Sequence, residues 1–361
     1  MQVYRLTGQA AATGLALAVE AAPALLIGAW AGVVIDRSDR RRLLIGAHLA
    51  AAASVLVMIA HGGLTLIYIG LFAENVTVAF LVPALRALTP AIVSGEADLA
   101  AANSTMAVTQ STTRLVAPVL GTLVLSQGSF AQIVLIDAAS YLVAALLLVR
   151  LAARPAPAVQ AAPRQLREGL AYLVRTPLLR GLALTTWAYW TANAGLTALL
   201  IPFLDRRLHQ PAQALGLLIT GLGVGYLLGS ALAKPLILRY ATRTLLIAAY
   251  TAVGLCFLVL FNAPNLTVAL AAVTASGIPG AVALVATQYR LQADTPDPVR
   301  GRVLAAFFTT DAAAAMTGAL VGPLLVGLAG LGWALTALSV AVLLAAPAAA
   351  IALPTPRADL V

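Results

Sequence analysis

Charge is scarce in this chain of 361 residues, because only 10% of them are Asp, Glu, Lys or Arg. The hydrophobic share is 61%, well above the roughly 45–50% that is typical of a soluble domain. The mean hydropathy of +0.95 agrees with that excess. A soluble globular domain is therefore excluded, and we expect an integral membrane protein that has the lipid bilayer as its partner.

Cysteine and histidine are almost absent as well. The single cysteine, Cys256, lies inside an apolar run, so the sequence excludes an intramolecular disulfide and a cysteine-rich metal site. The three histidines lie far apart, and no nucleophile–base pair or phosphate-binding loop accompanies them. We therefore expect no cofactor, no metal and no enzymatic activity. The net charge of +9 comes from basic residues scattered over short loops, which argues against nucleic acid as a partner.

Long apolar runs are what the chain has in abundance. A helix that crosses a bilayer needs roughly 20 mostly apolar residues, and the sequence contains eleven such runs. They predict an all-α integral membrane protein with eleven transmembrane helices, at about 14–35, 42–60, 65–86, 101–126, 131–151, 179–203, 214–236, 243–262, 266–289, 301–327 and 331–353.

Basic residues predict which loops face the cytoplasm, because Lys and Arg are retained on the side of synthesis. Six of the 35 charged residues lie at positions 36–42, in a loop with four arginines that follows the first span. With this loop inside, eighteen of the 22 Lys and Arg residues lie on the cytoplasmic side. We expect a multi-pass protein of the plasma membrane, with its N-terminus outside and its C-terminus in the cytoplasm.

One pattern recurs six helices apart. Gly28-x-x-x-Gly32 precedes the first basic loop, and Gly225-x-x-x-Gly229 precedes the loop that carries Lys234. The repeat implies two six-helix halves, the first of which lacks its first helix; a misplaced start, a true truncation and a fragment would look the same. The expected parts are a remnant of that helix at 1–13, a five-helix bundle at 14–151, a cytoplasmic linker at 152–178, a six-helix bundle at 179–353 and a tail at 354–361.

The linker between the two halves is basic and rich in proline. Within it, Leu166, Leu170 and Leu173 share one side of a helical pattern. Beside a membrane, such a segment is expected to lie in the interface as an amphipathic helix. A linker without regular structure is the alternative.

The loop at 36–42 also carries a resemblance to a known family. The spacing of Gly32, Asp36, Arg37, Arg40 and Arg41 resembles the loop between the second and third helices of the major facilitator superfamily. In that family the loop helps to lock two helical bundles on the cytoplasmic side. The resemblance implies a gating loop, whereas an ordinary basic loop without a mechanical role is the alternative.

Four further segments resemble one exporter branch of that superfamily, which holds enterobactin-type siderophore exporters and macrolide efflux proteins. They are 101–121, 136–141, 164–179 and 296–303. The resemblance implies the major facilitator fold, with two pseudo-symmetric helical bundles. The last segment adds Gly301 and Arg302 to the gate. We expect the carboxylate of Asp36 to meet the positive end of the helix that begins near Gly301.

Ionisable groups inside the spans are the candidates for a transport site, because charge is costly within a bilayer. At about 1.5 Å per residue, Glu74 and Arg114 come to similar depths and could pair. Burial favours a neutral carboxyl and an opposite charge favours an ionised one, which is the balance that a proton-switched site needs. A static ion pair is the alternative, and His48 is expected near the inner interface rather than in a relay. The predicted proton and substrate cavity comprises Glu20, Glu74, Gln110, Arg114, Asp137 and Asp311.

Taken with the resemblance, these features predict a secondary active exporter that works by alternating access. Its expected cargo is an amphiphilic small molecule of the drug or siderophore class, its expected drive is proton antiport, and we expect a monomer. A non-transporting membrane sensor, an assembly partner or an inactive truncated transporter is the alternative.

Overall fold

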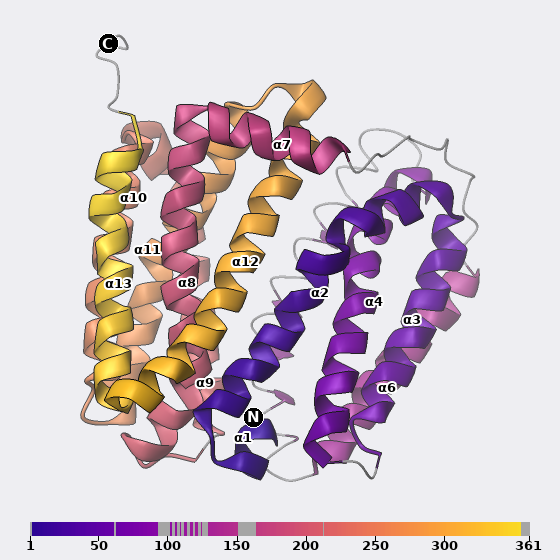
Figure 1. The fold of residues 1–361 in the computed structure, drawn as a ribbon, viewed down its shortest axis with the longest axis horizontal. Coiled ribbons are helices and arrows are strands. Elements are labelled where there is room, and N and C mark those ends of the chain that lie inside the picture. The colour runs from indigo at the N-terminus through magenta and orange to yellow at the C-terminus, as the bar shows by residue number, and fades with distance from the viewer. Residues whose placement is uncertain are drawn as a thin grey trace. The chain divides into compact units, whose positions relative to one another are not determined.

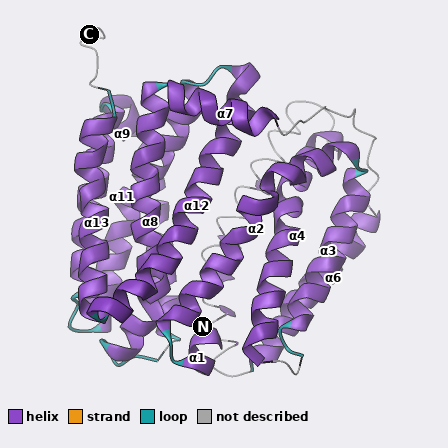
Figure 2. Ribbon diagram, in the orientation of Figure 1, coloured by secondary structure: helices purple, strands orange, loops and turns teal. Residues whose placement is uncertain are grey.

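The computed structural model describes residues 2–60, 63–92, 129–150, 164–211 and 213–354, together with isolated positions between 102 and 124. All regular structure in these ranges is helical (Figure 2). Eight of the described helices are long and apolar enough to cross a membrane. The predicted all-α membrane architecture is thereby confirmed, while the span expected at 101–126 falls mostly outside the described residues.

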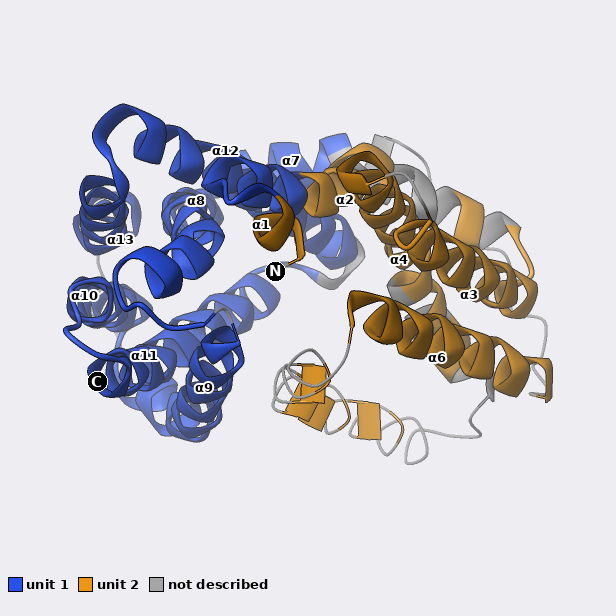
Figure 3. Cartoon of the chain, turned by 90° about the horizontal axis from the view of Figure 1, so that it is seen from below, with its two compact units in different colours: residues 1, 7–18, 166–361 blue, residues 2–6, 19–165 orange. Residues whose placement is uncertain are grey.

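Two compact units make up the chain, and Figure 3 colours them separately. One unit comprises residues 2–6 and 19–165, and the other comprises residues 7–18 and 166–361. We refer to them as the N-terminal and the C-terminal unit. The helix Ala10–Arg37 contributes to both, because the division falls within it.

Helices α3 and α4 form the best-packed part of the N-terminal unit, and α6 lies against α3. Its small core contains Ile35, Leu44, Ala84 and Leu88. Within the segment 1–13 a short helix ends at Thr7, and Gly8, with a φ of 64°, separates it from α2. The helices are α1 Gln2–Thr7, α2 Ala10–Arg37, α3 Arg40–Val57, α4 Gly63–Ile92 and α6 Phe130–Arg150 (Figure 1).

Six long helices and one short surface helix form the C-terminal unit. The long helices pack as neighbouring pairs, chiefly α9 with α11, α8 with α12, and α10 with both α11 and α13. A large apolar core runs between them. The helices are α7 Arg164–Arg175, α8 Pro177–Arg206, α9 Ala214–Arg239, α10 Thr242–Phe261, α11 Leu266–Ala293, α12 Asp297–Ala329 and α13 Leu331–Ala352 (Figure 1).

Glycines let the long helices of this unit approach at backbone distance. A methyl group at Gly225 of α9 would lie 2.9 Å from the Cα atom of Gly277 on α11. On α12, a methyl group at Gly318 would lie 3.0 Å from the backbone nitrogen of Gly195 on α8. Such contacts between small residues replace the hydrophobic driving force that helices lack inside lipid. They fix how close α8, α9, α11 and α12 stand.

Polar caps set several helix ends. Between α2 and α3, the Asp39 side chain accepts a hydrogen bond from the backbone nitrogen of Arg42 at 3.0 Å. Asn265 does the same at the start of α11, where it accepts from the nitrogen of Val268 at 3.0 Å. Helix α12 begins at Asp297 rather than near Gly301. Proline favours the first turn of a helix, and Pro298 lies in that turn, directly after the N-cap Pro296 and Asp297.

Candidate functional site

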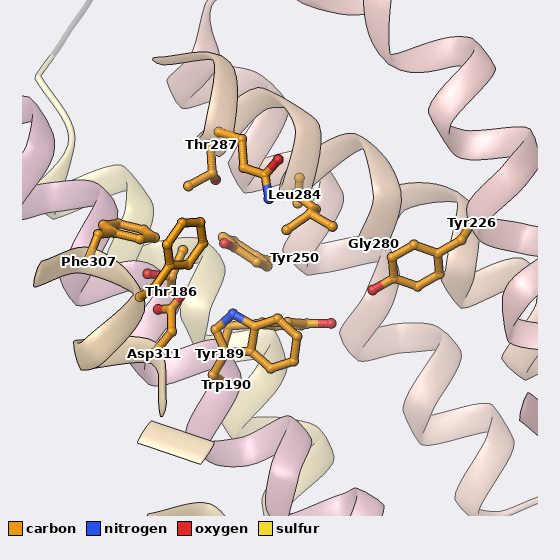
Figure 4. A pocket seen from close by; sticks show the side chains of 13 residues that line it. Thr186, Tyr189, Trp190, Tyr226, Tyr250, Gly280, Leu284, Thr287, Phe307 and Asp311 are labelled. Atoms are coloured by element: carbon orange, nitrogen blue, oxygen red, sulfur yellow. The ribbon is translucent and has the colours of Figure 1, made fainter. Parts of the chain in front are cut away.

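A small pocket opens among five helices of the C-terminal unit. Its walls come from α8, α9, α10, α11 and α12, so it depends on the packing of the whole unit. Figure 4 shows the side chains around it. The lining residues are Thr186, Tyr189, Trp190, Tyr226, Tyr250, Gly280, Ala283, Leu284, Thr287, Gln288, Phe307, Phe308 and Asp311.

Aromatic rings make up much of the wall. The ring centroids of Tyr189 and Tyr250 are 5.2 Å apart, and their planes are tilted by 35°. Trp190 meets Tyr189 edge-on at 5.5 Å, with 71° between the planes. Only 9% of Tyr189 and 2% of Tyr250 are exposed, so packing holds these rings in place. Rings at different tilts present both faces and edges to the pocket.

Asp311 is the one ionisable carboxyl of the lining, and the lining contains no Lys, Arg or His. Its Oδ1 atom is buried and has no hydrogen-bond partner within the described part of the chain. Thr186 lies beside it (Figure 4). At about 1.5 Å per residue, Asp311 lies roughly 21 Å along α12 from the helix start, far inside the span. A carboxyl at that depth is costly and marks a functional site by default.

A second polar group occurs in the N-terminal unit, between α4 and α6. The hydroxyl of Tyr141 donates a hydrogen bond to Oε1 of Glu74 at 2.9 Å. The ring of His48 on α3 meets the Tyr141 ring edge-on at 6.1 Å, and its Nδ1 lies 2.7 Å from the carbonyl oxygen of Leu44. Asp137 lies one turn before Tyr141 on α6. Three helices thus bring a carboxyl, a phenol and an imidazole together.

The predicted cavity residues divide between these two places. Glu74 and Asp137 lie in the N-terminal unit with Tyr141, and Glu20 is partly buried in α2. Asp311 lines the pocket of the C-terminal unit. Gln110 and Arg114 fall outside the described residues, so the pairing of Arg114 with Glu74 stays a prediction.

The predicted gate is described only in part. The side chains of Gly32, Asp36 and Arg37 lie outside what the structure describes, and Arg40 is partly buried at the start of α3. Three other gate residues are described. Arg41 donates through Nε to the carbonyl oxygen of Leu148 at 2.8 Å, which ties α3 to the end of α6. Arg302 forms an ion pair with Glu168 of α7 at 2.7 Å, and Gly301 has open space around its Cα atom.

Sequence reasoning missed the aromatic members of both sites. Tyr141 lies in the segment 136–141 that resembles the exporter branch, and Tyr189, Trp190, Tyr226 and Tyr250 belong to no motif. A usable signal existed, because only 6% of the chain is aromatic. A Tyr-Trp pair in the middle of the span predicted at 179–203 is unusual, since these residues prefer the membrane surface.

Comparison with known proteins identifies the family. The chain matches the family described as "Transmembrane secretion effector" over residues 6–360, nearly its whole length. It belongs to this family of the major facilitator superfamily. It is therefore a multi-pass membrane protein of a superfamily of transporters.

Two similar relatives carry the name macrolide efflux protein A. The one from Streptococcus pyogenes is 31% identical over 203 residues, which cover 54% of this chain and 50% of the relative. The one from Enterococcus faecalis is 31% identical over 187 residues, which cover 49% of this chain and 58% of the relative. In these alignments the chain spans about half the length of the curated relatives that it matches.

Solved transporters share the fold at low sequence identity. The nucleoside transporter NupG aligns with a TM-score of 0.74 at 13% identity, over 95% of this chain and 90% of that chain. A bacterial homolog of the human lysosomal transporter Spinster, in an inward-facing and occupied conformation, aligns with a TM-score of 0.78 at 14% identity, over 97% and 90%. These matches confirm the major facilitator fold.

Proposed function

We propose that the protein is a secondary active exporter that moves amphiphilic small molecules, of the drug or siderophore class, by proton antiport. The observation that carries the proposal is the pocket of the C-terminal unit, where aromatic rings surround a carboxyl deep inside a spanning helix. Such a mixture of apolar wall and few polar groups suits an amphiphilic ligand. The relatives named macrolide efflux protein A support the direction of transport.

The proton is taken up at Glu74 in this proposal. The hydroxyl of Tyr141 donates a hydrogen bond to Glu74, and this neutral donor stabilises an ionised carboxylate less than a neighbouring cation would. Glu74 also forms no ion pair with another described residue, so a proton is the simplest compensation for its charge inside the membrane. Tyr141 acts as a positioning residue, and Asp137, Glu20, Gln110 and Arg114 complete the predicted coupling region.

The remaining parts of the proposal follow from the sequence. The two halves alternate access to the cargo, the protein works as a monomer in the plasma membrane, and the N-terminus lies outside with the C-terminus in the cytoplasm. The loop at 36–42 acts as the cytoplasmic gate, in which Asp36 contacts the start of α12 at residues 297–300.

Transport in proteoliposomes tests this proposal. With an imposed pH gradient, a fluorescent amphiphile such as ethidium should move against its own gradient, and a protonophore should abolish that movement. Glu74→Gln should remove the dependence on the gradient, because an amide cannot exchange the proton. Tyr141→Phe should weaken the coupling, whereas Tyr68→Phe, which removes a hydroxyl from the same helix as Glu74, should leave it unchanged.

Three results would contradict the proposal. Movement that only ever runs down the cargo gradient would exclude antiport. Gradient-driven movement by Glu74→Gln at the wild-type rate would exclude Glu74 as the proton site. No movement of any amphiphile by folded protein would favour the sensor or assembly-partner alternative.

A further inference from the structure

We propose that the surface helix α7 binds anionic phospholipids of the leaflet beside it, and that this contact restrains the start of α12. The side chains of Leu170 and Val174 enter the edge of the hydrocarbon layer, while Arg167 and Arg175 meet the lipid phosphates. The inference goes beyond the proposed function, because it concerns a lipid partner and needs neither cargo nor proton.

The contacts of α7 with the C-terminal unit fix which side of this helix is covered. A methyl group at Gly169 would overlap the backbone carbonyl oxygen of Arg302, so α7 and α12 meet at backbone distance. Leu173 is only 3% exposed and belongs to the apolar core of the unit. Gly169 and Leu173 lie four residues apart and therefore on the same side of the helix. That side faces the protein, and a rotation of α7 would break both contacts.

The same contacts hold α7 at the membrane surface. Arg302 lies in the first turn of Val299–Ala329, a stretch of α12 that is long and apolar enough to cross a membrane. Only Thr176 separates the end of α7 from the start of α8. Figure 1 shows α7 lying across the ends of α8 and α12. A helix in this place is within reach of the lipid headgroups.

A second side of α7 is uncovered although it is partly apolar. Leu170 is 43% exposed and Val174 is 48% exposed, and their spacing of four residues places them on one side of the helix. Arg167, one turn before Leu170, and Arg175, directly after Val174, are exposed as well. Apolar side chains flanked by arginines are what an interfacial helix presents to a bilayer.

Charge selects the kind of lipid. Between residues 164 and 180 the sequence carries four arginines and a single acidic residue, Glu168. Glu168 forms an ion pair with Arg302 at 2.7 Å, so its charge is already compensated within the protein. The excess of positive charge favours anionic over zwitterionic phospholipids. Each arginine close to an anionic surface strengthens binding by about fivefold.

Two contacts connect a lipid on α7 to the start of α12. Glu168 reaches the side chain of Arg302, and Gly169 packs on the backbone of the same residue. A lipid that restrains α7 therefore also restrains the first turns of α12, where Gly301 and Arg302 belong to the predicted gate. Bound anionic lipid should slow amide hydrogen exchange at residues 299–305, because local opening of this segment becomes rarer.

Fluorescence quenching of the full chain in phosphatidylcholine nanodiscs tests the lipid contact. Cys256→Ser removes the single native cysteine, and Val174→Cys then carries a fluorophore on the exposed side of α7. The quenchers are nitroxide-labelled phosphatidylglycerol and nitroxide-labelled phosphatidylcholine with the same acyl chains. The mole fraction that halves the emission should be at least about fivefold lower for phosphatidylglycerol. A fluorophore at Leu344→Cys, an exposed position within α13, should be quenched equally by both lipids.

Matched variants separate the arginines of α7 from net charge. Arg167→Gln together with Arg175→Gln should lower the preference for phosphatidylglycerol by about fivefold or more. Arg5→Gln together with Arg239→Gln removes the same number of positive charges outside α7, and it should keep the preference. Soluble glycerol phosphate should not relieve the quenching, because it lacks the acyl chains that the apolar side chains of α7 contact.

Each result supports or overturns the inference. Equal quenching at residue 174 by the two lipids, or a preference that persists without Arg167 and Arg175, would overturn lipid binding by α7. Relief by glycerol phosphate would show a site for free phosphate instead. A lipid preference without slower exchange at residues 299–305, measured with and without phosphatidylglycerol, would overturn the connection to α12. Because these measurements use no cargo and no pH gradient, their outcome is independent of the proposed export.

Discussion

The contact between α8 and α12 sets the distance between two walls of the pocket, and Gly318→Ala perturbs it directly. Tyr189 and Trp190 stand on α8, and Asp311 stands on α12. An added methyl group at Gly318 would overlap the backbone carbonyl oxygen of Thr191, and it would lie 2.8 Å from the carbonyl carbon of that residue and 3.0 Å from the nitrogen of Gly195. All of these are backbone atoms, so no side chain can rotate away.

The magnitude follows from these distances. Non-bonded carbon atoms prefer a separation of about 3.5–4.0 Å, so the two helices must separate by roughly 1 Å at this point. Overpacking of this kind destabilises a protein by about 1–3 kcal/mol. In a domain of 150–250 residues each kcal/mol lowers Tm by about 2–4 °C. We therefore expect an apparent Tm about 2–12 °C below that of the wild type, with weaker binding in the pocket.

Gly327→Ala on the same helix provides the control. A methyl group there has no atom within 4 Å, and alanine favours a helix over glycine by at most about 1 kcal/mol. Thermal unfolding in one detergent, followed by intrinsic fluorescence, should show the Gly318 variant well below the Gly327 variant. If both variants melt at the wild-type temperature, the close approach of α8 and α12 is not as described, and the reasoning fails.

Two other predictions concern a helix cap and the gate. Asn265→Ala should lower stability by about 1 kcal/mol, because α11 loses the side-chain acceptor for the nitrogen of Val268. Thr267→Ala, which shortens an exposed side chain in the first turn of the same helix, is the control in the same unfolding assay. Asp36→Asn should abolish export in the proteoliposome assay while the protein still reaches the membrane, since the gate loses its anion. Full export by that variant would remove the gating role.

Much of the architecture could be predicted from the sequence, because hydrophobicity and charge act locally. Runs of about 20 apolar residues have no stable place other than a bilayer or a helical core, so the all-α membrane fold follows without any tertiary information. The motifs around Asp36 and Arg302 indicated the superfamily, which the match over residues 6–360 confirms. Helix ends were less certain: α12 begins at Asp297 and α2 at Ala10, because proline and glycine fix the actual starts.

The sites depended on tertiary structure. The sequence identified Glu74 and Asp311 as costly groups within spans, since an ionisable side chain is costly in the hydrocarbon layer wherever it is found. Which partners surround them depends on helix rotation, which the sequence does not reveal when small residues line most helix faces. The packing of five helices placed Tyr189 and Tyr250 around the pocket of Asp311. The packing of α3, α4 and α6 gave Glu74 a phenol from Tyr141 and brought the ring of His48 beside that phenol.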